Sequence, residues 1–173
     1  MTLRIVTDSS ADIPPQQAAG LGISVLPLFI NVGSRSYRDD VDLSRSEFYR
    51  RLPEFDPPPK TAAPGPEVLR QIYDRLADEG ASEILSIHVA ARLSSMMDTA
   101  ISAAREARRA AVTVFDSGQL SLGTGFAVLA AARAAARGCS LVEVIRLIED
   151  QLARTHVFAA LDTFTYLRRS GRV

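Results

Sequence analysis

Hydroxyl and carboxyl side chains stand where predicted strands give way to helices. Ser94 and Ser95 follow a β-branched run at residues 84–89 and precede a stretch with helical periodicity. A helix start favours a negatively charged group, because its unpaired backbone N–H groups and its dipole both attract negative charge. The two serines therefore suit a carboxylate or phosphate site, and they equally suit simple capping of the helix.

Two other positions offer similar chemistry. Asp8 follows a first apolar run at residues 3–7, and side chains just past the end of a strand lie where α/β sheets bind ligands. Thr61 stands in a proline-rich stretch, residues 53–66, which its prolines make extended and semi-rigid. A hydroxyl held in place by a stiff loop suits a binding site, although both residues also suit local bracing of their loops.

The composition narrows the classes of function. The 173 residues carry 20 basic and 20 acidic side chains, so the charge gives no reason to expect nucleic acid or an anionic membrane as a partner. Two histidines and one cysteine are too few for a zinc site or a disulfide framework. No apolar run is long enough for a membrane span, and the first residues lack the layout of a signal peptide. We therefore expect a cytoplasmic protein with no metal and no cofactor.

Strand and helix patterns alternate along the chain. Runs rich in β-branched and apolar residues predict strands at 3–7, 23–32, 84–89, 112–115 and 157–161. Capping residues and helical periodicity between them predict helices, with clear capping boxes at Ser44 and Ser140. This alternation predicts the α/β class, with a largely parallel sheet flanked by helices.

Some features that look catalytic have a structural interpretation. The spacing of Gly118, Gly123 and Gly125 matches neither the dinucleotide nor the Walker pattern, so we expect these glycines to permit close helix packing. His88 lies within the central strand, where we interpret it as a satisfied core or edge histidine. A serine hydrolase with Ser94 as its nucleophile is a rival hypothesis, but no Gly-x-Ser-x-Gly elbow surrounds that serine.

Several separated motifs resemble the DegV family of bacterial fatty-acid-binding proteins. The segment IVTDSSADIP at residues 5–14 is similar to the family's opening signature, and LDTFTYLRRSGRV at residues 161–173 is similar to a later one. Lys60-Thr61 and Leu93-Ser94 are similar to landmarks between them, in the same order. The resemblance therefore runs from end to end of the chain.

This resemblance implies a division of the chain into domains. It implies a DegV-like first domain over residues 1–155 and only the beginning of a truncated second domain over residues 156–173. The second domain of the family would cover apolar surface of the first. Since exposed apolar patches favour association, we expect the chain either to form a homodimer through that surface or to be poorly soluble.

The resemblance also implies a carrier and not an enzyme. Proteins of this family bind a long-chain fatty acid and present its carboxylate to a partner ATP-dependent fatty acid kinase, which forms an acyl-phosphate for phospholipid synthesis. By this resemblance Thr61 and Ser94 hold the carboxylate, and Arg172 acts near the head group in acyl-phosphate formation. Apolar side chains around the helix start are candidates for lining the acyl chain: Leu93, Met96, Met97 and Ile101.

The chain departs from the family pattern near the expected head group. Ala90 and Ala91 stand where the family has serines, Ser95 stands where it has glycine, and Ala62 and Ala63 follow the loop threonine. Fewer hydroxyls leave fewer donors for a carboxylate. A truncated α/β interaction module without lipid binding therefore stays an alternative hypothesis.

Overall fold

A four-stranded parallel sheet forms the centre of the molecule. The computed structural model describes residues 2–170. The strand order is β2-β1-β6-β7, with β1 at Leu3–Asp8, β2 at Ser24–Leu26, β6 at Glu83–His88 and β7 at Ala111–Asp116. The two inner strands, β1 and β6, are buried on both faces over most of their length, which explains why apolar residues dominate them on both faces. The predicted α/β class with a parallel sheet is confirmed.

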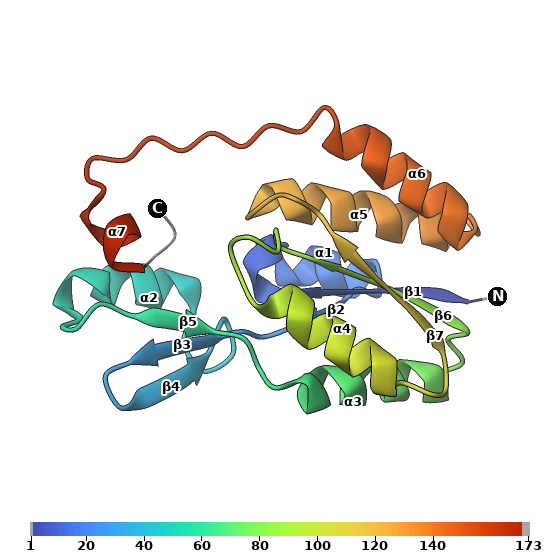
Figure 1. The fold of residues 1–173 in the computed structure, drawn as a ribbon, viewed down its shortest axis with the longest axis horizontal. Helices are drawn as coiled ribbons and strands as arrows, with labels where there is room; N and C mark the ends of the chain where they lie inside the picture. The colour runs from blue at the N-terminus through green and yellow to red at the C-terminus, as the bar shows by residue number, and fades with distance from the viewer. Residues whose placement is uncertain (1, 171–173) are drawn as a thin grey trace.

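Helices cover both faces of this sheet (Figure 1). One face carries α1 (Pro15–Gly20), α5 (Leu122–Ala136) and α6 (Leu141–Leu152), and the other carries α3 (Pro66–Asp78) and α4 (Met96–Glu106).

Small residues let α5 lie close to the rest of the molecule. This helix is rich in alanine and is buried on most of its sides, because it lies between the sheet and α6. A Cβ atom added at Gly125 would lie 2.3 Å from the carbonyl oxygen of Ala11, and one added at Gly123 would lie 2.7 Å from Val157 Cγ2. The predicted close packing is confirmed at Gly123 and Gly125. It is wrong at Gly118, where φ is +60° and an added Cβ would meet no atom within 4 Å.

A second, antiparallel sheet lies beside the carboxyl ends of the parallel strands (Figure 1). Its order is β4-β3-β5, with β3 at Phe29–Val32, β4 at Arg35–Arg38 and β5 at Lys60–Ala62. The prediction of one strand over residues 23–32 is wrong, because the chain leaves the first sheet after β2 and enters the second at β3. Pro27 stands between the two strands, and proline cannot donate a hydrogen bond to a continuing ladder.

Two short helices precede the proline-rich stretch. They are α2 (Arg45–Arg51) and the 3-10 helix η2 (Leu52–Glu54). Ser44 caps α2, since its hydroxyl accepts a hydrogen bond from the backbone N–H of Glu47 at 3.3 Å. This is half of the predicted capping box, because the Glu47 carboxylate pairs with Arg51 and Arg50.

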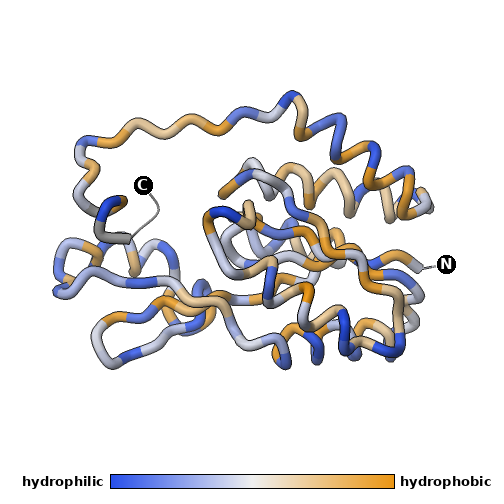
Figure 2. The backbone as a smooth tube through the Cα atoms, viewed as in Figure 1, coloured by the Kyte–Doolittle hydropathy of each residue, from blue (hydrophilic) through white to orange (hydrophobic). Residues whose placement is uncertain are grey.

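The last described part of the chain runs back over the molecule as an extended segment from α6 to α7 (Thr165–Ser170), as Figure 1 shows. The predicted strand at residues 157–161 is wrong, since this segment pairs with no strand in the described chain. Figure 2 shows it as mostly hydrophobic, and Phe158 is 92% exposed. A strand pattern produces a strand only where a neighbouring strand edge is available for pairing. Among residues 2–170, no helix is both long enough and apolar enough to cross a membrane.

Candidate functional site

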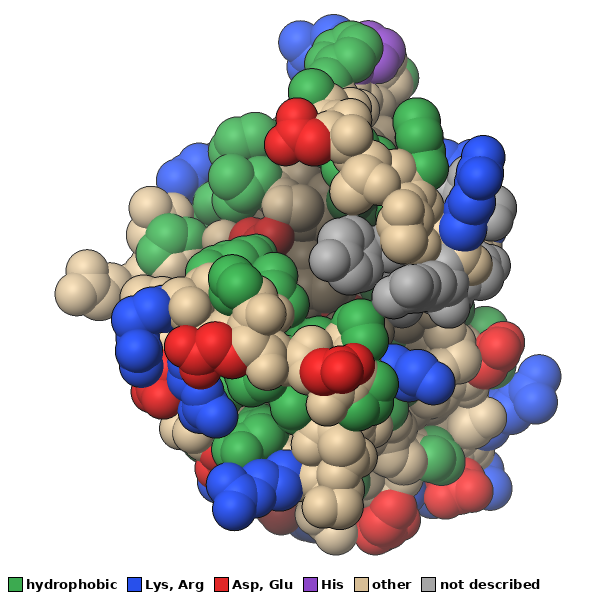
Figure 3. All heavy atoms as spheres, turned by 90° about the vertical axis from the view of Figure 1, so that its left-hand side faces the viewer, with side chains coloured by type: hydrophobic (Ala, Val, Ile, Leu, Met, Phe, Trp, Pro, Cys, Tyr) green, Lys and Arg blue, Asp and Glu red, His purple; other side chains and the backbone are tan. Residues whose placement is uncertain are grey.

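A large cavity lies where the parallel strands end and the second sheet begins. Its volume is about 1320 Å³. The 3-10 helix η1 (Ser9–Ala11), which follows β1, forms one part of its wall, and α2 with the proline-rich stretch forms another. Figure 3 shows this side of the molecule, where hydrophobic side chains border a hollowed centre. The lining residues are Ser10, Asp12, Leu28, Ile30, Asp39, Arg45, Phe48, Tyr49, Leu52, Pro53, Phe55, Asp56, Pro57, Pro58, Pro59, Lys60, Thr61, Val89, Leu120 and Ser121.

Aromatic and proline side chains make much of this lining apolar. Phe48 lies edge-on to Tyr49 with 5.4 Å between ring centroids, and 6.1 Å separates it from Phe55. The sequence predicts the proline-rich stretch as a stiff loop that suits a binding site, but it does not predict these aromatic side chains as part of that site. Phe48 and Tyr49 in α2, and Leu52 at the start of η2, could have been recognised as apolar side chains at helical spacing after the cap at Ser44.

Thr61 lies in this cavity wall. In the antiparallel pairing of β3 with β5, Thr61 stands opposite Ile30. Side chains that stand opposite each other project from the same face of a sheet, and residues two apart in a strand share that face. Ile30 and Leu28 also line the cavity, so the hydroxyl of Thr61 is on the cavity side of the sheet.

Ser94 lies in the turn between β6 and α4. Its Oγ accepts a hydrogen bond from the backbone N–H of Met96 at 3.2 Å, which is the capping role open to it from the sequence. Val89, which begins the same turn, lines the cavity. Ser94 is not among the lining residues in the described part of the chain, so the structure does not by itself bring the two predicted carboxylate ligands together.

The other predicted site residues have different surroundings. Met96 is fully buried in the core beneath α3 and α4, with Leu93 packed against the same core. Met97 is half-buried, and Ile101 is 37% exposed. None of these four lines the cavity within the described chain. Arg172 lies outside the described residues.

An arginine joins α2 to the loop after β1. The Arg45 guanidinium pairs with the carboxylate of Asp12, donates to the carbonyl oxygen of Ser9 at 2.6 Å and lies 3.3 Å from Asp39 Oδ2. Burial raises the pKa of Asp39, and the neighbouring carboxylates of Asp40 and Asp8 raise it further. This part of the cavity wall is therefore rich in acceptors, and its arginine is already engaged.

Ser121 completes this part of the wall in a rare backbone conformation. Its φ is 51° and its ψ is −138°, and its hydroxyl donates to the carboxylate of Asp12. A non-glycine residue at such angles is strained, and such strain is concentrated at ligand sites. This strained conformation supports the interpretation of the cavity as a ligand site, and no sequence pattern predicted it.

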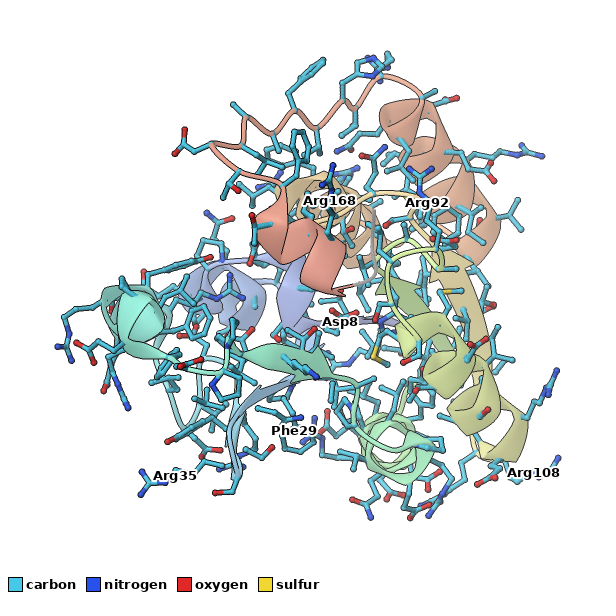
Figure 4. The ribbon with its side chains drawn as sticks, turned by 60° about the vertical axis from the view of Figure 1, so that its left-hand side comes forward. Asp8, Phe29, Arg35, Arg92, Arg108 and Arg168 are labelled. Carbon is cyan, nitrogen blue, oxygen red and sulfur yellow. The ribbon has the colours of Figure 1, made fainter. Side chains whose placement is uncertain are left out.

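A chain of buried hydrogen bonds leads from the cavity wall into the core. Asp8 ends β1 and is 1% exposed, deep between the layers (Figure 4). Its Oδ1 accepts hydrogen bonds from the backbone N–H of Ser10, at 3.0 Å, and from the Ser10 hydroxyl. Its Oδ2 lies 2.7 Å from Nδ1 of His88, whose Nε2 lies 2.8 Å from Ser86 Oγ. Tyr73 donates to the same Ser86 oxygen at 2.8 Å.

The hydrogen bonds from Tyr73 through Ser86 and His88 all donate in one direction, toward Asp8. Burial raises the pKa of Tyr73 to about 12, so its hydroxyl keeps its proton and donates to Ser86. Ser86 therefore donates its own hydrogen to Nε2 of His88, and the ring hydrogen resides on Nδ1, where it is donated to Asp8. His88 is thus the satisfied core histidine expected from the sequence.

The sequence contained a signal for this chain of contacts. Ser86 and His88 are two apart in a strand and so share one face, and β1 pairs with β6 in parallel with Val6 opposite Ser86. Extending that register places Asp8 beside His88. The register itself is a tertiary fact that the sequence pattern did not supply.

The buried chain also bears on the hydrolase hypothesis. Ser86, His88 and Asp8 have the connectivity of a serine–histidine–aspartate triad, but Ser86 and His88 are 0% exposed, so no substrate reaches them. Both ring nitrogens of His88 are engaged, which leaves neither as a base for Ser94.

Comparison with known proteins places these features in a family. The family model described as an uncharacterised protein of the DegV family matches residues 2–173. A DegV domain-containing protein of Streptomyces coelicolor is 37% identical over 169 residues, which are 98% of this chain and 59% of the relative. A DegV domain-containing protein of Deinococcus radiodurans is 33% identical over 173 residues, which are 100% of this chain and 61% of the relative.

Comparison with solved structures points to the same family. A Thermus thermophilus structure, described as fatty acid binding of a DegV family protein, superimposes with a TM-score of 0.85 at 35% identity and covers 99% of this chain and 60% of its own. Bacillus subtilis DegV, described as a fatty acid binding protein, gives a TM-score of 0.88 at 26% identity, with 99% of this chain and 61% of its own covered. The chain thus spans about 60% of the length of the relatives it matches.

Proposed function

Because the chain belongs to the DegV family, we propose that it binds a long-chain fatty acid in the cavity beside Thr61 and presents the carboxylate to a partner protein. The similar structures from Thermus thermophilus and Bacillus subtilis, both described as fatty acid binding, support the ligand class. The observation that carries the proposal is the cavity of about 1320 Å³, with its aromatic and proline lining. Apolar walls with a few placed polar groups are typical of small-molecule sites, and this volume exceeds their usual range of about 300–1,000 Å³.

The proposed head-group site uses two hydroxyls. Thr61 faces the cavity from β5, and Ser94 accepts a hydrogen bond from the backbone, which leaves its own hydrogen for a carboxylate. A carboxylate takes up several such donors, and bonds to a charged group are stronger than neutral ones. In this proposal the acyl chain extends along Phe48 and Phe55. Leu93, Met97 and Ile101 border the ligand only where it passes α4, and the fully buried Met96 lies behind them.

Direct analysis of the purified protein tests the ligand class. The full chain is purified from bacteria without added lipid, extracted under denaturing conditions and analysed by mass spectrometry. We expect a long-chain fatty acid at less than one equivalent, and added palmitate should bind in calorimetry. No extracted acyl chain, together with no heat of binding, would overturn the proposal.

Two matched variants test the head-group site. Thr61→Val keeps the shape of the side chain and replaces its hydroxyl with a methyl group, and Ser94→Ala removes the hydroxyl at the start of α4. Each should weaken palmitate binding by about 1.5–3 kcal/mol, the range for hydrogen bonds to a charged group, without unfolding the protein. Ser94→Ala should also lower the free energy of unfolding by about 0.5–2 kcal/mol, because it removes the hydroxyl that caps the start of α4. Unchanged affinity in both variants would place the carboxylate elsewhere.

The proposed partner is an ATP-dependent fatty acid kinase that phosphorylates the bound acid in the cytoplasm. Arg172 is assigned to this step and not to holding the ligand. Arg172→Ala should therefore keep palmitate affinity while formation of the acyl-phosphate by the kinase is lost. A large fall in affinity in that variant would contradict the assignment.

A second candidate function rests on exposed apolar side chains. Phe126 at the start of α5 is 50% exposed, and the extended segment that follows α6 adds Phe158 at 92% and Phe164 at 57%. These side chains suit an interaction module or a homodimer. Sedimentation over a wide range of concentrations, with and without palmitate, separates the two functions. A monomer that binds palmitate supports the carrier, and a dimer that binds none supports the module.

A further inference from the structure

The Ser10 hydroxyl is held with its hydrogen turned away from the cavity. Ser10 lines the cavity, but it donates that hydrogen to Asp8 Oδ1 in the interior. What it offers to the cavity is therefore an oxygen that accepts hydrogen bonds and does not donate them. The neighbouring wall residues Asp12 and Asp39 are carboxylates, so the wall around η1 also presents hydrogen-bond acceptors to the cavity.

The orientation of Asp8 depends on donors at both of its oxygens. Ser10 bonds to Oδ1, and the Nδ1 hydrogen of His88 bonds to Oδ2 at 2.7 Å. Both Asp8 and His88 are nearly or fully buried, so water does not replace either donor. The ring of His88 is fixed in turn by the hydrogen that Ser86 donates to Nε2. Removing the Nδ1 hydrogen would free the carboxylate of Asp8 to rotate and would release Ser10 with it.

From this geometry we infer that His88 is a positioning residue for ligand recognition: through Asp8 it holds Ser10 as a fixed acceptor in the cavity wall. This inference rests on the proposed function. A fatty acid carboxylate also accepts hydrogen bonds, so it reaches Ser10 only through a water molecule, which donates one hydrogen to each. The carboxylate itself is held by the hydroxyls of Thr61 and Ser94, as proposed above, and the wall around η1 fixes its position through bound water.

Nuclear magnetic resonance of the histidine rings tests this coupling. The chain has two histidines, and His156 is exposed, so it serves as an internal control. In protein labelled at histidine, saturating palmitate should shift the ring signals of His88 and leave those of His156 in place. In Ser10→Ala the ligand should still bind, but the His88 signals should no longer respond. Signals of His88 that stay fixed in the wild type, or that move equally in Ser10→Ala, would overturn the inference.

Two variants of similar shape separate positioning from simple packing. His88→Asn keeps an N–H group near the position of Nδ1, whereas His88→Leu has the same branching and no hydrogen to donate. His88→Leu should weaken palmitate binding by about tenfold or less, as Ser10→Ala does, and His88→Asn should bind nearly as the wild type does. The double variant Ser10→Ala/His88→Leu should be no weaker than either single variant, because both remove the same contact. Equal losses in the two His88 variants, or additive losses in the double variant, would refute positioning.

The outcomes also separate this inference from the proposed function. If palmitate neither binds nor changes the backbone signal of Thr61, both are overturned. If palmitate binds and changes Thr61 while His88 is unaffected, only the present inference fails. If His88→Leu does not fold, the ligand-induced shifts in the wild type and in Ser10→Ala still decide the question.

Discussion

Replacing Gly125 with alanine would test how α5 is seated against the wall of the cavity. The added Cβ would lie 2.3 Å from the carbonyl oxygen of Ala11 and 3.4 Å from Cγ1 of Ile13, whereas real Cβ contacts essentially never fall below 3.0 Å. Ala11 belongs to η1 and the contact is with its backbone, so the clash cannot be relieved by a side-chain rotation. Helix α5 and η1 would have to separate by at least about 0.7 Å.

The expected cost follows from two opposing effects. Overpacking of a well-packed interior costs about 1–3 kcal/mol, and exchanging glycine for alanine within a helix returns about 0.5–1 kcal/mol. We therefore expect Gly125→Ala to lower the free energy of unfolding by about 1–2 kcal/mol, measured by urea denaturation. Because η1 carries Ser10 and borders Asp12, the same variant should also weaken palmitate binding.

Gly20→Ala is the matched control. Gly20 is the last residue of α1, and an added Cβ there meets no atom within 4 Å, so only the gain in helix propensity remains. This variant should be as stable as the wild type or more stable by about 0.5–1 kcal/mol, with unchanged palmitate affinity. If Gly125→Ala were as stable as Gly20→Ala, with the same slope of the unfolding free energy against urea concentration, the close approach of α5 to η1 would be refuted.

The buried chain and the acidic wall give the remaining predictions. Ser86→Ala should lower the free energy of unfolding by about 2–4 kcal/mol, because it leaves the Tyr73 hydroxyl and Nε2 of His88 buried without partners. Tyr73→Phe should cost only about 0.5–1.5 kcal/mol, since Ser86 keeps its bond to His88; equal losses in urea denaturation would contradict the assigned direction. The fold raises the pKa of Asp39 and so disfavours its ionised form, which means that Asp39→Asn should be more stable than the wild type at pH 7. The stability advantage of Asp39→Asn should shrink as the pH falls toward 3.8, the ordinary pKa of an aspartate. A variant less stable than the wild type at pH 7 would instead show that the ion pair of Asp39 with Arg45 outweighs burial.

Local signals in the sequence determined most of the parallel body. The runs at residues 3–7, 84–89 and 112–115 became β1, β6 and β7, because short runs rich in β-branched and apolar residues favour strands that pack within an α/β fold. Ser140 started α6 with the predicted capping box, since capping depends on residues within one turn of the helix. The family resemblance was also readable, because its motifs are short and contiguous.

The candidate site was decided by contacts between residues far apart in the chain. Thr61 was found from its motif, but its place on the cavity side depends on β5 pairing with β3, a strand that the sequence had merged with β2 across Pro27. The apolar lining from α2 looked like an ordinary helix face, because amphipathicity reports that a face is covered and not what covers it.

The buried chain that ends at Ser10 shows the same limit. Asp8 and His88 are 80 residues apart, and each alone suited a loop brace or a core position. Only the register of β1 against β6 joins them, since a slip of one residue would turn His88 to the opposite face of the sheet. The sequence by itself thus determined the inner strands of the parallel sheet, the capped helix starts and the family to which the chain belongs. The tertiary structure decided which side chains share the cavity wall, because strand register and sheet pairing are set by long-range packing that no local pattern encodes.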